Sequence, residues 1–326
     1  MWPGKIRHRT TFFQSPNHQE RNRAGGKPGP VRAILTDRFS LGIPQARWTT
    51  HWRTDMPKAK WNDTEIAYSL RGTGDPLVLI GGFTMTKETW GPVVSALASK
   101  FQVLTFDNRG VGETTYPAAP FTIADMAADT IGLLSALDIP KAHFFGVSMG
   151  GLITQTILLE YPDRVLKAAL GCTSHGGRHA VQPSPDILNA LASFADASVP
   201  PEERMRRAIP VLYSDRFVLE HPDKIEEFVR VGARYLPTPE GAAAQFRALS
   251  VFNVKKRLSE IRRPVLVITG DQDRMMPPEN SHLLAEGIPN AELCIIPEAG
   301  HSFFHEKPRE VAERLIAFFS GNRQAA

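Results

Sequence analysis

Short apolar runs alternate with longer amphipathic segments along most of this chain. Continuous apolar runs of four to six residues have the length of strands buried on both faces of a sheet. Strands are predicted at residues 65–70, 77–80, 102–106, 142–147, 165–170, 265–269 and 293–296. Helices are predicted at residues 88–100, 123–137, 149–160 and 308–319. This alternation predicts an α/β fold with a doubly wound, mostly parallel sheet.

One segment, from residue 175 to about residue 257, breaks this alternation. It has no convincing strand pattern, but it has helical patterns at residues 187–195, 202–213, 224–235 and 241–249. Because α/β folds bind ligands at the carboxyl edge of the sheet, we expect this insertion to form a helical cap over that edge. The predicted core is then 56–174 and 258–326, and the cap is 175–257. A second structural domain without a role in the site is the alternative.

The first 55 residues differ in composition from the rest of the chain. They are rich in Arg, Pro and Gly without sustained periodicity, which predicts a disordered basic tail at 1–55. This tail carries a net charge of +7, whereas the remainder carries −3. The basic character therefore belongs to the tail, and no nucleic-acid or membrane partner is expected for the folded body. The tail faintly resembles an organellar transit peptide; translation from Met56 is the other explanation.

The apolar runs and the cysteines indicate the cellular compartment in which the protein is expected. No run approaches the roughly 18 apolar residues that span a bilayer, and no secretory apolar core lies near the first residue. The two cysteines, Cys172 and Cys294, both lie in apolar strand-like runs. Two cysteines do not make a disulfide framework, so we expect buried, inert thiols and a cytoplasmic location.

The stretch Gly146-Val147-Ser148-Met149-Gly150 joins an apolar run to a helical run. It matches the G-x-S-x-G nucleophile elbow, in which a serine occupies a tight strand-to-helix turn. Side chains two residues before and after the serine would collide with the neighbouring strand and helix, so glycine is required there. An ordinary glycine turn has the same pattern, and the decision depends on whether an acid and a histidine follow.

Acyl transfer by a serine also needs a base and an acid that orients the base. Two candidate acids, Asp271 and Asp273, follow the predicted strand at 265–269, and the candidate base His301 follows the last strand. The order Ser, acid, His is the one that accompanies this elbow. All candidates lie at carboxyl ends of strands, and hence at one edge of the sheet. The sequence therefore predicts Ser148 as nucleophile and His301 as general base.

From residue 65 to residue 320 the chain resembles the alpha/beta-hydrolase superfamily. The matching pieces are GGF at 81–83, FDNRGVG at 106–112, GVSMG at 146–150, GDQDRMMP at 270–277, and GHS at 300–302 followed by EKP at 306–308. The resemblance implies that Asp273, three residues after the strand-end glycine, is the acid, and that Asp271 has a loop hydrogen-bonding role. It also implies an oxyanion hole from the backbone N–H groups of Phe83 and Met149.

The chain departs from the superfamily pattern at the start of the predicted oxyanion loop. The oxyanion loop begins with Gly81 and Gly82, where the superfamily commonly has His-Gly, which puts the loop geometry in doubt. Asp107 and Arg109 are expected to have a structural role and to brace the loop beside the oxyanion strand. His305 lies four residues after His301, but no third ligand is evident, so no metal site is predicted. The candidates for lining an apolar acyl pocket are Phe83, Trp90, Met149, Phe246 and Phe252. The motifs fix the positions of Phe83 and Met149, whereas core packing is the leading expectation for the other three.

Within the superfamily, the chain is similar to cap-bearing esterases and to 3-oxoadipate enol-lactonases. This resemblance implies hydrolysis of a small-molecule carboxylic ester or lactone through an acyl-enzyme, without metal or organic cofactor. C–C bond hydrolases, perhydrolases and acyltransferases use the same triad, and a hydrolase-fold ligand receptor without turnover is a further alternative. Neither the substrate nor the oligomeric state follows from the sequence.

Overall fold

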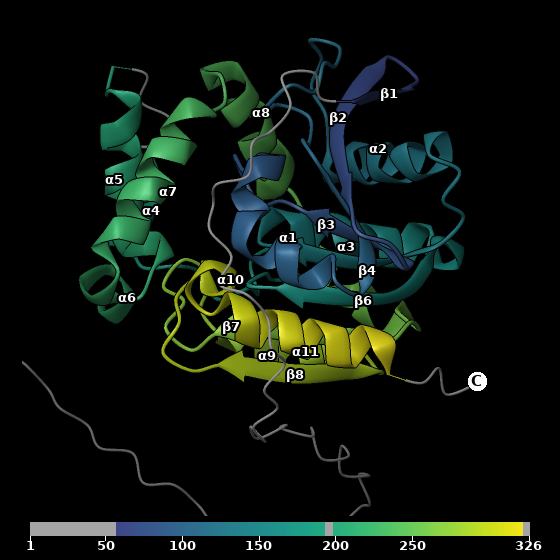
Figure 1. The fold of residues 1–326 in the computed structure, drawn as a ribbon. Coiled ribbons are helices and arrows are strands. Elements are labelled where there is room, and N and C mark those ends of the chain that lie inside the picture. Colours follow the sequence, from purple (N-terminus) through teal and green to yellow (C-terminus); the bar gives the residue numbers. More distant parts are fainter. Residues whose placement is uncertain (1–56, 193–197, 322–326) are drawn as a thin grey trace, which may run out of the picture. The chain divides into compact units, whose positions relative to one another are not determined.

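The fold is built on an eight-stranded sheet in a computed structural model that describes residues 57–192 and 198–321 (Figure 1). The strands are β1 (Lys58–Trp61), β2 (Thr64–Arg71), β3 (Asp75–Ile80), β4 (Phe101–Phe106), β5 (Ala142–Val147), β6 (Val165–Gly171), β7 (Val265–Gly270) and β8 (Ala291–Ile296). Their order across the sheet is β1-β2-β4-β3-β5-β6-β7-β8. The tail predicted at residues 1–55 lies outside the described residues.

Most neighbouring strands in this sheet are parallel. The pairs from β4 and β3 through to β7 and β8 run parallel, whereas β1 and β2, and β2 and β4, are antiparallel. The carboxyl ends of the parallel strands therefore meet at one edge. The doubly wound, mostly parallel α/β architecture predicted from the sequence is confirmed.

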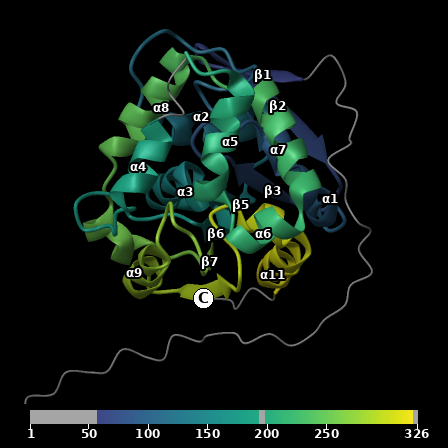
Figure 2. The ribbon, with the colours of Figure 1, turned by 90° about the vertical axis from the view of Figure 1, so that its left-hand side faces the viewer.

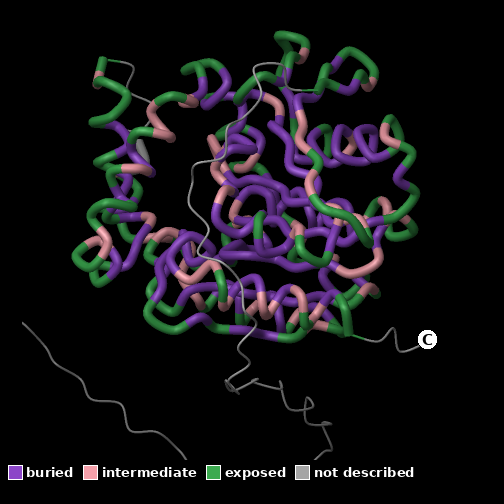
Figure 3. Tube along the Cα trace, viewed as in Figure 1, coloured by how far each residue is buried: buried purple, intermediate pink, exposed green. Residues whose placement is uncertain are grey.

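Helices cover both faces of the sheet. One face packs against α1 (Gly91–Leu97), α10 (Phe303–Glu306) and α11 (Pro308–Ser320), and the other against α2 (Ile123–Ala136), α3 (Met149–Glu160) and α9 (Glu279–Gly287). Successive residues of β5 alternate between the two apolar clusters, with Phe144 in one and Phe145 in the other. β5 and β7 are buried along their whole length, and β3 and β6 are buried over their last four residues (Figure 3).

A helical insertion separates β6 from β7 in the sequence. It contains α4 (Pro185–Ala192), α5 (Pro201–Leu212), α6 (Asp215–Glu220), α7 (Pro222–Arg234) and α8 (Pro239–Ser250). The helices α5, α6 and α7 share an apolar cluster that includes Met205, Tyr213 and Phe228, whereas α8 packs Ala244 and Ala248 into a core cluster. In Figure 2, α5 and α7 lie in front of the central strands. We call this insertion the cap; the boundaries 175–257 stay a prediction.

Four α-helices or strands were not predicted from the sequence: β1, α6, α9 and α10. The first two have only four and six residues, too few to establish a period. The predicted helix at 88–100 is shorter, because a 3-10 turn at Lys87–Trp90 precedes α1, which ends at Leu97. Among the described residues, no helix has the length and apolar character needed to cross a membrane.

Candidate active site

Ser148 occupies the turn between β5 and α3. Its backbone has φ 53° and ψ −119°, a left-handed conformation that is costly for a residue with a side chain. A Cβ atom at Gly146 would lie 2.2 Å from the Gly150 carbonyl oxygen, and one at Gly150 would lie 2.0 Å from the Ile80 carbonyl oxygen. Both glycines are therefore required by close backbone approach, as the elbow motif predicts.

Asp273 and His301 meet at the carboxyl edge of the sheet, from the loops after β7 and β8. The Nδ1 atom of His301 lies 2.8 Å from Oδ2 of Asp273, and both side chains are buried. The other carboxylate oxygen accepts hydrogen bonds from the backbone N–H groups of Met275 at 2.9 Å and Met276 at 2.7 Å. The carboxylate is thus fixed on both sides, and Nε2 is the imidazole nitrogen left to accept a proton.

A neighbouring charge and burial shift the pKa of His301 in opposite directions. Burial disfavours the imidazolium, but the Asp273 carboxylate outweighs this effect and holds the pKa of His301 well above its usual value of 6.5. Such a histidine is stabilised as a cation, which is the state a general base reaches after it has taken a proton.

The other candidate acid, Asp271, lies in the same loop but does not reach the imidazole. Its side chain is exposed, and its Oδ1 accepts a 3.3 Å hydrogen bond from the backbone N–H of Ala299. Asp271 thereby links the loop after β7 to the loop after β8. Of the two aspartates, only Asp273 is placed to orient His301.

A cavity of about 110 Å³ lies between the core and the cap. Ser148 and His301 both line it, together with Phe83 of the loop after β3. Among the described residues, no hydrogen bond joins the Ser148 hydroxyl to His301; the imidazole contacts the thiol of Cys172. Hydrogen bonds of this kind often form only with substrate bound, so Ser148 remains within the candidate set.

Two backbone N–H groups beside Ser148 are available to a ligand. A Cβ atom at Gly82 would lie 3.1 Å from the Cβ of Ser148, so the loop after β3 passes directly against the serine. Within the described part of the chain, the Phe83 N–H has no hydrogen-bond acceptor. The Met149 N–H belongs to the first turn of α3, where N–H groups lack partners inside the helix. This arrangement can bind an oxyanion.

Cys172, Asp273 and His301 form a cluster of possible metal ligands, with one atom of each within 4.8 Å of the others. Their donor types could hold a metal ion such as zinc. The Asp273 carboxylate, however, is already engaged by His301 and two N–H groups. Burial also raises the pKa of the Cys172 thiol, which keeps it protonated. The contacts favour an orienting role for Asp273.

His305 is a buried histidine whose role was not predicted. Its Nδ1 lies 2.9 Å from the hydroxyl of Tyr213, and its Nε2 lies 2.7 Å from the carbonyl oxygen of Thr89. A carbonyl oxygen can only accept, so Nε2 donates and Nδ1 accepts from Tyr213. Burial lowers the pKa of His305 to about 4, so the ring is neutral. Both nitrogens are occupied, which leaves none for a metal.

Glu306 ties the histidine loop to the cap. One carboxylate oxygen accepts from the backbone N–H groups of Gly300 at 2.8 Å and Ser214 at 3.2 Å, and the other accepts from the Ser214 hydroxyl. The N–H of Ser302 donates to the carbonyl oxygen of Leu212 at 2.7 Å. The residues on both sides of His301 are therefore held by the α5–α6 junction. The sequence contained one indication of this role, because Glu306 is an acidic residue in the otherwise apolar segment after His301.

The expected pocket lining was correct for Phe83 and wrong for Met149, whereas core packing was the leading expectation for the other three candidates. Of the five candidates, only Phe83 lines the cavity. Trp90 packs against the rings of Phe145 and Phe304, whereas Met149 and Phe252 belong to the core cluster. Phe246 is 59 % exposed, although its ring contacts Phe83. The cap lines the cavity from α5, α7 and the residues that follow α7, through Met205, Ala208, Leu212, Phe228, Val231, Gly232, Tyr235 and Leu236.

Comparisons with known proteins agree with this architecture. The family described as alpha/beta hydrolase fold matches residues 75–308. A poly(3-hydroxyalkanoate) depolymerase of Ectopseudomonas oleovorans is 31% identical over 257 residues, which are 77% of this chain and 86% of that relative. The crystal structure of an enol-lactonase from Burkholderia xenovorans LB400 is similar with a TM-score of 0.72 and 25% identity, over 81% of this chain and 100% of that one. The structure of Est816, an N-acyl homoserine lactone degrading enzyme, is similar with a TM-score of 0.68 and 28% identity, over 80% of this chain and 100% of that one.

Proposed function

This chain belongs to the alpha/beta hydrolase fold family, and from that premise we propose that it is a serine hydrolase of carboxylic esters or lactones. Ser148 is the nucleophile, His301 the general base and Asp273 the acid that orients it. One observation carries the proposal: the buried 2.8 Å hydrogen bond between His301 and Asp273, beside a cavity that Ser148 also lines.

The proposed reaction begins with attack of the Ser148 hydroxyl oxygen on the acyl carbon. His301 takes the hydroxyl proton at Nε2, and the Asp273 carboxylate stabilises the resulting imidazolium. The N–H groups of Phe83 and Met149 donate to the tetrahedral oxyanion, each contributing about 3–4 kcal/mol to transition-state stabilisation. His301 then protonates the departing alcohol oxygen, and the acyl group remains on Ser148. Water, deprotonated by His301, attacks this ester and releases the acid.

The cavity favours a neutral, apolar acyl group. Among the described residues that line it, none is Lys, Arg, Asp or Glu, and most have apolar side chains, which come from both the core and the cap. A substrate carboxylate in the acyl site would lose its hydration there without gaining a Lys or Arg partner, which is costly. Three of the similar proteins, a poly(3-hydroxyalkanoate) depolymerase and two lactone-cleaving enzymes, further support an ester or lactone substrate, whereas other relatives are named putative carbamate hydrolase and putative non-heme bromoperoxidase.

Hydrolysis of p-nitrophenyl butyrate tests the proposal. We expect turnover by the wild type and labelling of Ser148 by a fluorophosphonate probe. Ser148→Ala should lower kcat by roughly 10⁴-fold or more, whereas the control Ser250→Ala, at an exposed serine of α8, should retain it. A panel of short esters and lactones that all go unhydrolysed, together with no labelling of Ser148, would rule the proposal out.

The acyl preference has its own test. The monoester of p-nitrophenol with succinic acid has the same four-carbon acyl chain as the butyrate but carries a carboxylate. We expect kcat/KM to be at least about tenfold lower for the charged ester, which corresponds to a desolvation difference above 1 kcal/mol. Equal kcat/KM values for the two esters would contradict an uncharged acyl site.

A further inference from the structure

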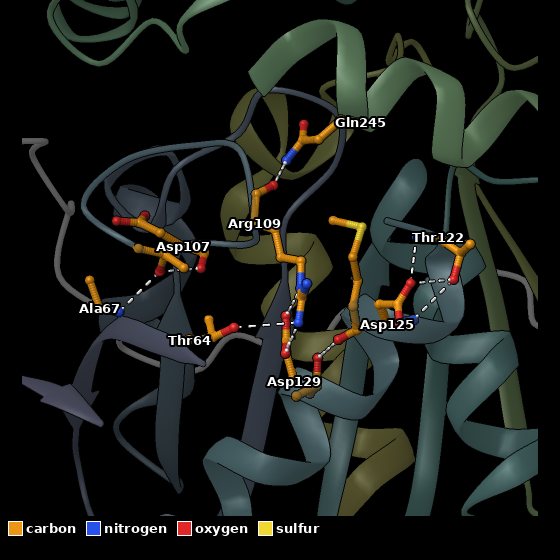
Figure 4. Close-up of polar contacts among 11 residues, drawn as sticks. Thr64, Ala67, Asp107, Arg109, Thr122, Asp125, Asp129 and Gln245 are labelled. Atoms are coloured by element: carbon orange, nitrogen blue, oxygen red, sulfur yellow. Dashed lines mark hydrogen bonds and ion pairs between the residues drawn. The ribbon is translucent and has the colours of Figure 1, made fainter. Parts of the chain in front are cut away.

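Gln245 of cap helix α8 bridges two loops of the core. Its side chain is fully buried, with 0% of its surface exposed. Its Oε1 accepts a 2.9 Å hydrogen bond from the backbone N–H of Thr84, and its Nε2 donates a 2.7 Å hydrogen bond to the carbonyl oxygen of Arg109. Figure 4 shows Gln245 reaching down from its helix to Arg109. Both polar ends of one cap side chain are thus used to hold core backbone.

The first of these loops carries a candidate oxyanion donor. Met85 donates to the Gly82 carbonyl oxygen at 3.2 Å, which closes a four-residue turn with Phe83 and Thr84 at its centre. Thr84 has φ 62°, in the left-handed region that a β-branched residue rarely adopts. The hydrogen bond from its N–H to Gln245 offsets this strain. It fixes the peptide that adjoins Phe83, and so restricts the direction of the Phe83 N–H.

Core residues hold the two ends of the same loop. Asn108 donates from Nδ2 to the Gly81 carbonyl oxygen at 3.1 Å, and the Lys87 N–H donates to Asp107 at 2.8 Å. The fully buried Lys87 ammonium also pairs with Asp107 at 2.8 Å. The ends of the oxyanion loop therefore depend on the core alone, whereas its centre, at Thr84, depends on the cap through Gln245.

The second loop gives Gln245 a rigid acceptor. The guanidinium of Arg109 forms a two-pronged ion pair with Asp129 of α2 and contacts the Thr64 hydroxyl at 3.4 Å (Figure 4). The backbone of this loop also touches α8, because a Cβ atom at Gly241 would lie 2.2 Å from the Gly110 carbonyl oxygen. This contact fixes the distance between α8 and the loop. Gln245 therefore reaches Thr84 only when α8 is packed against the core.

We propose that Gln245 is a positioning residue that makes the oxyanion hole depend on docking of the cap. With α8 seated, Gln245 holds Thr84 in its left-handed conformation and the Phe83 N–H faces the oxyanion. With α8 displaced, Thr84 loses its acceptor and the turn relaxes, so the hole loses one of its two donors. The inference rests on the proposed serine hydrolase function. It adds a role for a residue that touches no reacting atom.

The test compares Gln245→Met with the wild type on p-nitrophenyl butyrate. Methionine keeps the length and volume of glutamine but has neither the acceptor for Thr84 nor the donor for Arg109. Complete loss of one oxyanion donor costs about 10²–10³ in kcat, so a misplaced donor should lower kcat by about 10–100-fold. KM should stay within about threefold, because the ground-state carbonyl depends less on the hole. Arg247→Met, at an exposed position of the same helix, is the matched control and should match the wild type.

A second readout separates positioning from folding. A trifluoromethyl ketone forms a tetrahedral oxyanion adduct on the serine, and its affinity for Gln245→Met should fall by the same factor as kcat/KM. Should Gln245→Met fail to fold, Gln245→Glu replaces it. Its second carboxylate oxygen would face the Arg109 carbonyl oxygen, and their repulsion would displace α8 and with it the acceptor for Thr84, so kcat should fall at least about tenfold. A folded variant with wild-type kcat and ketone affinity overturns the inference. Wild-type activity in Ser148→Ala would instead overturn the proposed function itself.

Discussion

The hydroxyl of Tyr213 donates to Nδ1 of His305 across 2.9 Å, and this bond joins the cap to the helix that follows the His301 loop. The same junction includes Ser214, which is bound to Glu306, and Leu212, which is bound to Ser302. The cap therefore does more than cover the cavity. Its α5–α6 junction holds the backbone that carries the general base, so cap packing and active-site geometry are linked.

Acidification should destabilise the protein through His305. Its pKa is lowered to about 4 in the folded state by burial, against about 6.5 when unfolded, so the stabilisation is present above pH 6.5 and is lost as the pH falls toward 4. The loss amounts to about 3 kcal/mol in the free energy of unfolding. Urea denaturation of the wild type and His305→Gln over this pH range measures the effect. The difference between the two should change with pH; a constant difference would contradict the neutral, buried state.

Removal of the Glu306 carboxylate should destabilise the fold. Glu306→Ala leaves the buried N–H of Gly300 and the hydroxyl of Ser214 without acceptors, at a cost of roughly 2–3 kcal/mol. Denaturant unfolding at neutral pH gives this value. The matched control Glu292→Ala, at an exposed position of β8, should change stability by less than about 0.5 kcal/mol. Similar losses in the two variants would mean that the Glu306 contacts are not stabilising.

Replacement of Asp273 should impair catalysis far more than replacement of Asp271. Asn at 273 can still accept from the N–H groups of Met275 and Met276, but its amide would then face Nδ1 of His301 and favour the wrong tautomer. We expect Asp273→Asn to lower kcat by about 10⁴-fold. Asp271→Asn, which alters an exposed carboxylate of the same loop, should stay within about twofold. Steady-state kinetics on p-nitrophenyl butyrate measures kcat for both variants. A larger loss of kcat in Asp271→Asn than in Asp273→Asn would identify Asp271 as the acid.

Activity should rise with pH through the ionisation of His301. The neutral imidazole is the base, and the Asp273 carboxylate raises its pKa well above 6.5, so kcat/KM should be half-maximal above pH 6.5. The pH profile of kcat/KM for p-nitrophenyl butyrate measures this midpoint. A midpoint at or below 6.5 would show that Asp273 does not stabilise the cation. The linked stabilisation is fully present below pH 6.5 and is lost as the pH rises through the raised pKa.

Most of the fold could be predicted from the chain alone. Strands such as Leu77–Ile80 within β3 are continuous apolar runs because they are buried on both faces, and that requirement is local in sequence. The Ser148 elbow is predictable for the same reason: the glycines at 146 and 150 respond to backbone contacts of one tight turn. Because Ser148, Asp273 and His301 each follow a predicted parallel strand, the sequence also placed all three at one edge of the sheet.

The cap and its contacts depend on the tertiary structure. Gln245 lies 161 residues after Thr84, and Tyr213 lies 92 residues before His305, so no periodic pattern connects either pair. A fully buried glutamine and an exposed one have the same letter, and only packing decides which is present. The cavity lining shows the same limit, because the rotation of α5 and α7 determines which apolar residues face Ser148. The sequence by itself thus determined the sheet, the elbow and the candidate triad, since these follow from local backbone rules. Only the tertiary structure decided how the cap holds them, since that depends on contacts between distant segments.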